Sequence, residues 1–127
     1  MTLSRVAGGH GGSWSAQLAN GATSAGTCTL NDSPDWVKPT VAGKYNASVW
    51  VRGATARATL KLKITEYSGT TNVGSASTTA ALTTSWQKVS LNYTTVAPGS
   101  SLDFNTYITG APPGTCFYAD DAAIYLT

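Results

Sequence analysis

Residues 58–67, ATLKLKITEY, decide the fold because apolar and polar side chains strictly alternate over most of the segment. Successive side chains of a β-strand point to opposite faces, so this period of two predicts a strand with one face in a core and the other in water. The inward set is Leu60, Leu62 and Ile64, and the outward set is Lys61, Lys63, Thr65 and Tyr67.

The same alternation recurs in residues 44–52, KYNASVWVR, and in residues 101–109, SLDFNTYIT. The sets predicted to face the core are Tyr45, Ala47, Val49 and Val51 in the first segment and Leu102, Phe104 and Ile108 in the second. The outward sets place aromatic rings among polar groups, with Trp50 beside Arg52, and Tyr107 beside Asn105 and Asp103.

Period-two segments bounded by Gly, Pro, Asn and Ser recur along the chain, and no window has apolar residues at helical spacing. This pattern predicts an all-β fold, a two-sheet antiparallel β-sandwich of the jelly-roll type. Residues 31–43 are predicted to form a long surface loop, and residues 1–127 a single domain. The predicted strands are 2–6, 13–19, 27–31, 44–52, 57–67, 72–82, 85–95, 101–109 and 115–126.

Composition narrows the classes of partner. The chain is 42% hydrophobic but only 11% charged, against about 25% in a typical globular protein, which is characteristic of a secreted β-protein. A net charge of +2 without a run of like charges argues against a nucleic-acid partner. No apolar stretch approaches the roughly 18 residues of a membrane span, so no membrane partner is expected.

The two cysteines, Cys28 in GTCTLND and Cys116 in GTCFYAD, have two interpretations. They can be unrelated buried thiols, since free cysteine behaves as a small hydrophobe. They can also form a disulfide, which is our prediction. A disulfide would place the protein in an oxidising, extracellular compartment.

The acids Asp120 and Asp121 interrupt the last predicted strand and can be a catalytic pair, a metal site or a solvated strand end. Counting back in twos from Ile124 predicts that Asp120 points inward and Asp121 outward. Neighbours on opposite faces cannot act together on the two sides of one bond, and no other catalytic constellation is evident, so we expect no enzymatic activity.

An inward carboxylate needs a compensating partner. Four glycines surround His10 in residues 8–13, and the carbonyl groups of such a turn can join Asp120 around a calcium ion, which takes about six to eight oxygen ligands. The alternative is a plain hairpin turn and a solvated strand end.

A sugar ring needs a flat aromatic surface and fixed polar groups around it. The outward sets and the long loop supply such groups, although each also has a purely structural explanation. Trp14 shares a face with Ala16 and Leu18 and is assigned to the core. The candidate ligand-binding residues are Trp50, Arg52, Asp103, Asn105, Tyr107 and, from the loop, Trp36.

Four segments in this order and spacing resemble the galactose-binding-like jelly-roll carbohydrate-binding modules of families 4, 9, 16 and 22: GGHGGSWSAQL, KYNASVWVRGA, TTSWQKVSLNYT and FYADDAAIYL. The resemblance implies a structural calcium held by Asp120 and by main-chain oxygens near Gly11 and Ser13, with Asp121 beside them. The modules usually begin with a further strand, containing a Phe-Glu pair, that this sequence lacks.

The resemblance also implies a function. We expect a non-catalytic polysaccharide-binding module of a secreted bacterial carbohydrate-active enzyme, with a polysaccharide or oligosaccharide as ligand and a linked catalytic domain as partner. The alternative is a structural or assembly protein that uses an open sheet edge for strand exchange or homo-oligomerisation.

Overall fold

The computed structural model describes residues 1–32, 35–54 and 58–127, and within these ranges it contains nine strands and no helix. All nine predicted strands are confirmed to within two residues at their described ends. The predicted start of the fifth strand at residue 57 and residues 33–34 of the predicted loop lie outside the described ranges. The strands are β1 (Thr2–Ala7), β2 (Trp14–Asn20), β3 (Gly26–Asn31), β4 (Lys44–Gly53), β5 (Thr59–Ser68), β6 (Thr71–Ala81), β7 (Gln87–Thr94), β8 (Ser101–Ala111) and β9 (Gly114–Leu126).

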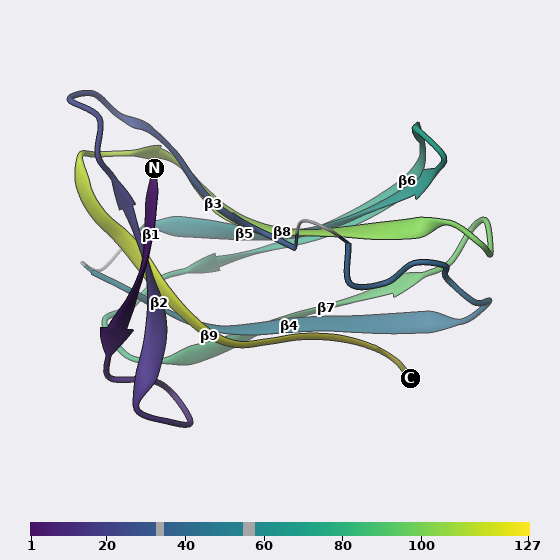
Figure 1. The fold of residues 1–127 in the computed structure, drawn as a ribbon, viewed down its shortest axis with the longest axis horizontal. Coiled ribbons are helices and arrows are strands. Elements are labelled where there is room, and N and C mark those ends of the chain that lie inside the picture. Colours follow the sequence, from purple (N-terminus) through teal and green to yellow (C-terminus); the bar gives the residue numbers. More distant parts are fainter. Residues whose placement is uncertain (33–34, 55–57) are drawn as a thin grey trace.

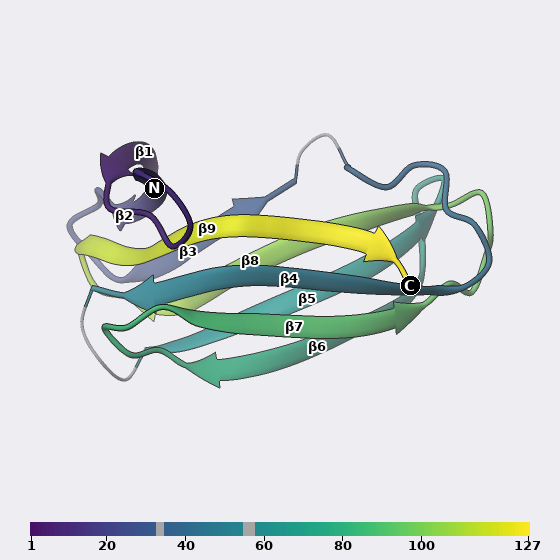
Figure 2. The ribbon, with the colours of Figure 1, turned by 90° about the horizontal axis from the view of Figure 1, so that it is seen from below.

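The strands form two antiparallel sheets that pack face to face, the jelly-roll sandwich that the sequence predicts. One sheet has the order β1-β2-β9-β4-β7, and the other has the order β3-β8-β5-β6. Figure 1 shows the two layers, with β1 and β2 standing at one end across the direction of the other strands. Figure 2 looks onto the five-stranded sheet and shows β9, β4 and β7 side by side. No helix that could cross a membrane is present in the part of the chain that the structure describes.

The core lies between the sheets and is built from the inward sets of the alternating strands. All ten side chains that the sequence assigns to the inward faces of β4, β5 and β8 are buried. A disulfide between Cys28 of β3 and Cys116 of β9 joins the two sheets, as predicted, across 88 residues of sequence. The burial of these side chains and the disulfide together hold the two sheets against each other.

The predicted inward direction of Asp120 is wrong. In the ladder between β4 and β9, Ser48 pairs with Ala123 but Trp50 pairs with Asp120, so β9 carries one extra residue at this point. Asp121 adopts a positive φ of 49° within this β-bulge. The bulge shifts the phase of the strand, and Asp120 therefore shares the outer face of the five-stranded sheet with Trp50.

The assignment of Trp14 to the core is also wrong, since this side chain is 50% exposed. Its phase along β2 is the inward one that Leu18 follows into the core. Its side chain nevertheless stays exposed, because it lines an open groove together with Leu3, Leu30 and Trp36.

Candidate functional site

The candidate ligand-binding residues lie on two opposite surfaces of the sandwich. Trp50 and Arg52 lie on the outer face of the five-stranded sheet, because β4 belongs to that sheet. Asp103, Asn105 and Tyr107 lie on the outer face of the four-stranded sheet, because β8 belongs to it. These residues therefore cannot form one continuous site, contrary to the sequence-based expectation.

On the five-stranded sheet, the aromatic rings are engaged by other groups of the protein. The ring of His10 stacks on Trp50, with centroids 3.6 Å apart and planes inclined by 14°. His10 also meets the ring of Trp86 edge-on. The guanidinium of Arg52 lies 3.8 Å from the ring centroid of Tyr118. Trp50 thus anchors the glycine turn to the sheet, and His10 covers one of its faces.

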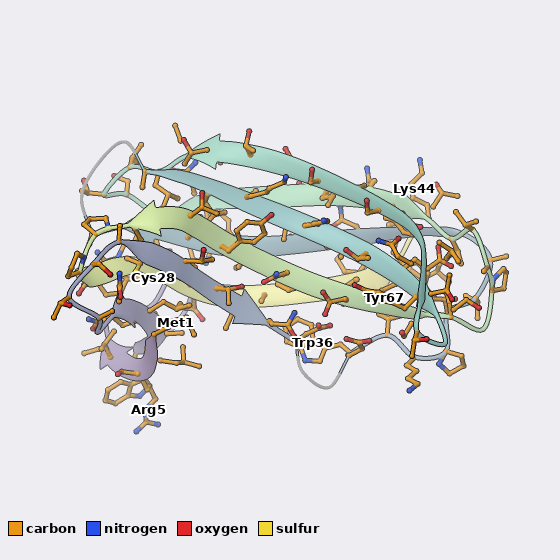
Figure 3. All side chains as sticks on the ribbon, turned by 90° about the horizontal axis from the view of Figure 1, so that it is seen from above. Met1, Arg5, Cys28, Trp36, Lys44 and Tyr67 are labelled. Atoms are coloured by element: carbon orange, nitrogen blue, oxygen red, sulfur yellow. A yellow bond between two sulfur atoms is a disulfide. The ribbon has the colours of Figure 1, made fainter. Side chains whose placement is uncertain are left out.

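The four-stranded sheet carries a groove of about 370 Å³ on its outer face. Figure 1 shows both ends of this sheet curving away from the other sheet, so that the outer face is concave. Figure 3 looks onto this face and shows Tyr67 toward one end of it. The lining residues are Thr27, Thr29, Lys63, Thr65, Tyr67, Asp103, Asn105, Tyr107 and Thr109.

Polar groups of the groove are oriented by hydrogen bonds across the sheet. The Thr29 hydroxyl donates to the side-chain oxygen of Asn105. The Asn31 side-chain amide donates to Oδ1 of Asp103 over 2.9 Å. Because β3 holds these two side chains of β8 in place, a ligand meets hydrogen-bonding groups with little freedom left to lose.

An acidic cluster lies beside this groove, where the loop after β3 meets β8. Carboxylate oxygens of Asp32, Asp35 and Asp103 lie within 4.8 Å of one another, so the cluster can hold a metal ion. Burial raises the pKa of Asp32 to about 6, although the backbone amides of Trp36 and Phe104 donate to its carboxylate and oppose the shift. The sequence interpretation missed this cluster, because only the pairing of β3 with β8 brings Asp103 to the loop.

The glycine turn is connected to the acids of β9, as the sequence interpretation requires. The backbone amide of His10 donates to Oδ2 of Asp120 over 2.9 Å, and Nδ1 of His10 lies 2.8 Å from Oδ2 of Asp121. Glycine has no Cβ atom, and three oxygens surround the position that a Cβ would take at Gly9. One of them is Oδ2 of Asp120, 2.8 Å from that position. The other two are the carbonyl oxygens of Gly12 and Trp14.

The carbonyl oxygens that converge on the turn are therefore not those of Gly11 and Ser13. The Ser13 carbonyl accepts a hydrogen bond of 2.9 Å from the amide of Gly8 and closes the turn. Gly11 lies near Asp121, since a Cβ at Gly11 would be 3.1 Å from its Oδ2.

A second groove, of about 580 Å³, lies on the β1 and β3 side of the sandwich. Trp36, predicted to cover a ligand, lies here and not over the first groove, with its ring 5.3 Å from that of Phe104. Figure 3 shows Trp36 at the edge of the four-stranded sheet. The guanidinium of Arg5 lies 4.4 Å from the ring of Trp14 in the same groove. Its lining is mainly apolar, and includes Leu3, Leu30, Ala119 and Ala122.

The sequence model of the carbohydrate-binding domain family matches residues 2–114, which is most of the chain. The chain belongs to this family. The resemblance of the chain to carbohydrate-binding modules is confirmed, and membership of this family supports the binding of sugars. No curated protein sequence matches this domain.

Solved structures agree on the fold. A family 61 module, TmCBM61 in complex with β-1,4-galactotriose, aligns with a TM-score of 0.69 at 16% identity, covering 98% of this domain and 82% of that chain. The CBM22-1 xylan-binding domain of Xyn10C from Paenibacillus barcinonensis aligns with a TM-score of 0.68 at 21% identity, covering 98% and 80%. A family 16 module aligns with a TM-score of 0.65 at 18% identity, covering 97% and 84%.

Proposed function

We propose that residues 1–127 form a module that binds a polysaccharide or oligosaccharide in the groove on the outer face of the four-stranded sheet. The observation that supports this proposal best is the combination, on one concave surface, of Tyr67 and Tyr107 with Lys63, Asp103 and Asn105. The second groove does not combine aromatic and polar side chains in this proportion, because most of its lining is apolar.

The chemistry of the groove suits a pyranose ring. The apolar C–H face of the ring packs on Tyr107, because an aromatic side chain provides a flat apolar surface. The hydroxyl groups at the edge of the ring exchange hydrogen bonds with Asp103 and Asn105, which offer acceptors and an amide donor. Tyr67 lies six residues beyond the partner of Tyr107 along β5, or roughly 20 Å, so a chain of several sugars fits between the two rings.

The role of the module is binding without catalysis. A retaining or inverting glycosidase places two carboxyl groups on either side of the scissile bond. Asp103 belongs to the groove, but its acidic neighbours Asp32 and Asp35 do not line it, and Asp32 is buried and held by backbone amides. A module of this kind holds a linked catalytic domain near its substrate and raises the local concentration. The disulfide supports secretion into an oxidising extracellular space. The similar xylan-binding domain from Paenibacillus barcinonensis supports a bacterial source.

Affinity electrophoresis against a panel of polysaccharides tests the proposal. We expect at least one glycan to retard the protein, and Tyr107→Ala to abolish the retardation because it removes the stacking surface. Trp50→Ala is the matched control on the opposite face, and it should leave retardation unchanged. If Trp50→Ala abolished the retardation and Tyr107→Ala preserved it, the ligand would bind on the five-stranded sheet, and the proposal would be wrong.

A structural calcium ion in the glycine turn is the second part of the proposal. Oδ2 of Asp120 and the carbonyl oxygens of Gly12 and Trp14 converge at Gly9, and this all-oxygen donor set suits calcium. Asp121, which lies near Gly11, is the further candidate ligand, whereas the carbonyls of Gly11 and Ser13 are not part of this donor set. Calcium should raise the melting temperature, and Asp120→Ala should remove the increase. The same increase in Asp120→Ala would show that the ion binds elsewhere, for example at Asp32, Asp35 and Asp103.

Assembly through an open sheet edge is the second candidate function. It is favoured by the second groove, beside which Leu3, Trp14 and Trp36 remain 58%, 50% and 53% exposed. This groove lies between β1 and β3, the edge strands of the two sheets on that side. Exposed edges and apolar patches favour association. Light scattering at high protein concentration should then detect a dimer or larger species that Trp14→Ser weakens, whereas a strictly monomeric protein would exclude this function.

A further inference from the structure

Lys61 and Lys63 project side by side from β5 onto the concave outer face of the four-stranded sheet. Both side chains are partly buried, whereas the lysines at positions 38, 44 and 88 are exposed. The described residues include all six acidic side chains of the chain, and their one ion pair joins His10 to Asp121. Neither Lys61 nor Lys63 therefore has a carboxylate partner within the protein.

The residues that pair directly with the two lysines across the sheet are uncharged. Lys61 pairs with Tyr107 on β8 and with Thr79 on β6. Lys63 pairs with Asn105 and with Ser77. Lys63 lines the groove and Lys61 lies beside it on the same outer face, so this part of the face presents two ammonium groups among a tyrosine ring, an amide and hydroxyl groups.

The opposite charge on this face lies toward the other end of the groove. Asp103 pairs with Thr65, which lies two residues beyond Lys63 and four beyond Lys61 along β5, or roughly 7 Å and 13 Å from them. The carboxylates of Asp32 and Asp35 lie next to Asp103 and reinforce the negative potential there. The groove consequently has a positive part near Tyr107 and a negative part near Asp103, between Tyr107 and Tyr67.

A partly buried ammonium without a partner retains part of its desolvation cost, which an incoming anion relieves. An ionised oxygen also makes a stronger hydrogen bond to lysine than a sugar hydroxyl does. An anion opposite Asp103 is repelled for the same electrostatic reasons. The charge pattern therefore selects a ligand that carries its negative charges at intervals.

Resting on the proposed sugar-binding function of this groove, we propose that its ligand is an anionic glycan in which charged sugars alternate with neutral ones. A carboxylate or sulfate group of the ligand lies between Lys61 and Lys63, beside the ring that stacks on Tyr107. A neutral sugar lies over Asp103. Thr79 and Ser77 of β6, which pair with the two lysines, supply further neutral hydroxyl groups beside them.

Isothermal titration calorimetry with matched oligosaccharides tests this inference. Hyaluronan oligosaccharides carry a carboxylate on every second sugar, and their carboxyl-reduced form is the neutral counterpart. Keratan sulfate oligosaccharides and their desulfated form make the equivalent pair for sulfate. We expect the charged member of at least one pair to bind about tenfold or more tightly than its neutral counterpart, as a charge-assisted hydrogen bond warrants. The pair that shows the preference identifies the anion.

Two variants locate the effect. Lys61→Gln combined with Lys63→Gln should remove the preference for the charged member, whereas Lys88→Gln, on β7 of the other sheet, should preserve it. A preference that survives the double substitution would overturn the inference. So would tighter binding of polygalacturonate, which carries a carboxylate on every sugar, or equally tight binding of single-stranded DNA, which would indicate general attraction of polyanions.

The failure of this inference can be distinguished from the failure of the proposed function. If the neutral oligosaccharides bind as tightly as the charged ones and Tyr107→Ala weakens both, the sugar site stands and the anionic ligand is excluded. If no glycan, charged or neutral, binds at all, both the site and the inference are overturned.

Discussion

Glu66 is a fully buried carboxylate, 0% exposed, at the end of β5. Its oxygens accept four hydrogen bonds, from the hydroxyl groups of Tyr93 and Ser100 and from the backbone amides of Val96 and Ala97. Burial alone would raise the pKa of Glu66, but these donors outweigh burial and lower the pKa to about 2. The ionised side chain thus secures the loop between β7 and β8 to the sheet.

This arrangement predicts a loss of stability in acid. Because the pKa of Glu66 is lowered on folding from 4.5 to about 2, its contribution is complete above pH 4.5 and is lost as the pH falls toward 2. The difference corresponds to about 3 kcal/mol of unfolding free energy. Glu66→Gln should lose a similar amount at pH 7 and show a smaller further loss at pH 3. Urea unfolding at both pH values measures this, and an unchanged pH dependence in the variant would contradict it.

Thr106, unlike Glu66, is a buried polar residue without hydrogen bonds from its side chain. It is 0% exposed, and its hydroxyl has no hydrogen-bond partner among the described residues. Valine has nearly the same shape without the polar group. Thr106→Val should therefore raise the unfolding free energy by about 1 kcal/mol, because an unsatisfied buried hydroxyl is removed. Thr40→Val is the matched control and should destabilise, because the Thr40 hydroxyl lies 2.7 Å from that of Ser100. Stabilisation by both, or by neither, in urea unfolding would refute the explanation.

At the scale of elements, alternation was sufficient to predict the strands and their inward faces wherever apolar and polar residues contrast, as in β5 and β8. It failed in β9, because residues 119–123 are alanines and aspartates that give no size contrast by which a bulge could be detected. It failed at Trp14 for a different reason, since the phase was right but the side chain lines an open groove. Whether an inward-facing position is covered is a tertiary property that a single strand does not encode.

The bulge itself can be tested at Asp121, whose φ of 49° lies in the left-handed region. Aspartate tolerates this region, glycine adopts it freely and alanine does not. Asp121→Gly and Asp121→Ala both lose the contact with His10, so the difference between them isolates the backbone effect. We expect Asp121→Ala to be less stable than Asp121→Gly by about 1 kcal/mol in thermal or urea unfolding. Equal stabilities would mean that the backbone does not require this conformation.

At the scale of the whole molecule, the distribution of strands between the sheets decides where a ligand can bind. The sequence indicates that Trp50 and Tyr107 both point away from the core, but not that they do so on opposite sides. That information resides in the strand order, in which β4 and β8 belong to different sheets. The candidate residues on β8 were therefore identifiable from the sequence, whereas Lys63 and Tyr67 joined them only through the pairing of β5 with β8.

The disulfide acts on the whole molecule as well, because it links β3 to β9 across 88 residues. A crosslink of this span restricts the unfolded chain and should contribute about 4–5 kcal/mol on the chain-entropy account. Reduction of the disulfide should lower the unfolding free energy by about this amount, which a lower urea midpoint of unfolding would reveal. The double variant Cys28→Ala and Cys116→Ala should unfold at the lower midpoint with or without reductant. A variant as stable as the oxidised protein would show that packing alone holds the sheets together.

The central claim is that sugar binds in the groove on the four-stranded sheet. The most direct test follows the backbone amide and indole NMR signals while an oligosaccharide that retards the protein in electrophoresis is titrated in. All four tryptophans lie outside the groove on the four-stranded sheet. We predict shifts concentrated at the amides of Lys63, Asn105, Tyr107 and their neighbours on β5 and β8, with the indole signals of Trp14, Trp36, Trp50 and Trp86 unchanged. Shifts concentrated at Trp50 and Trp86, or at Trp14 and Trp36, with β5 and β8 silent, would contradict the account.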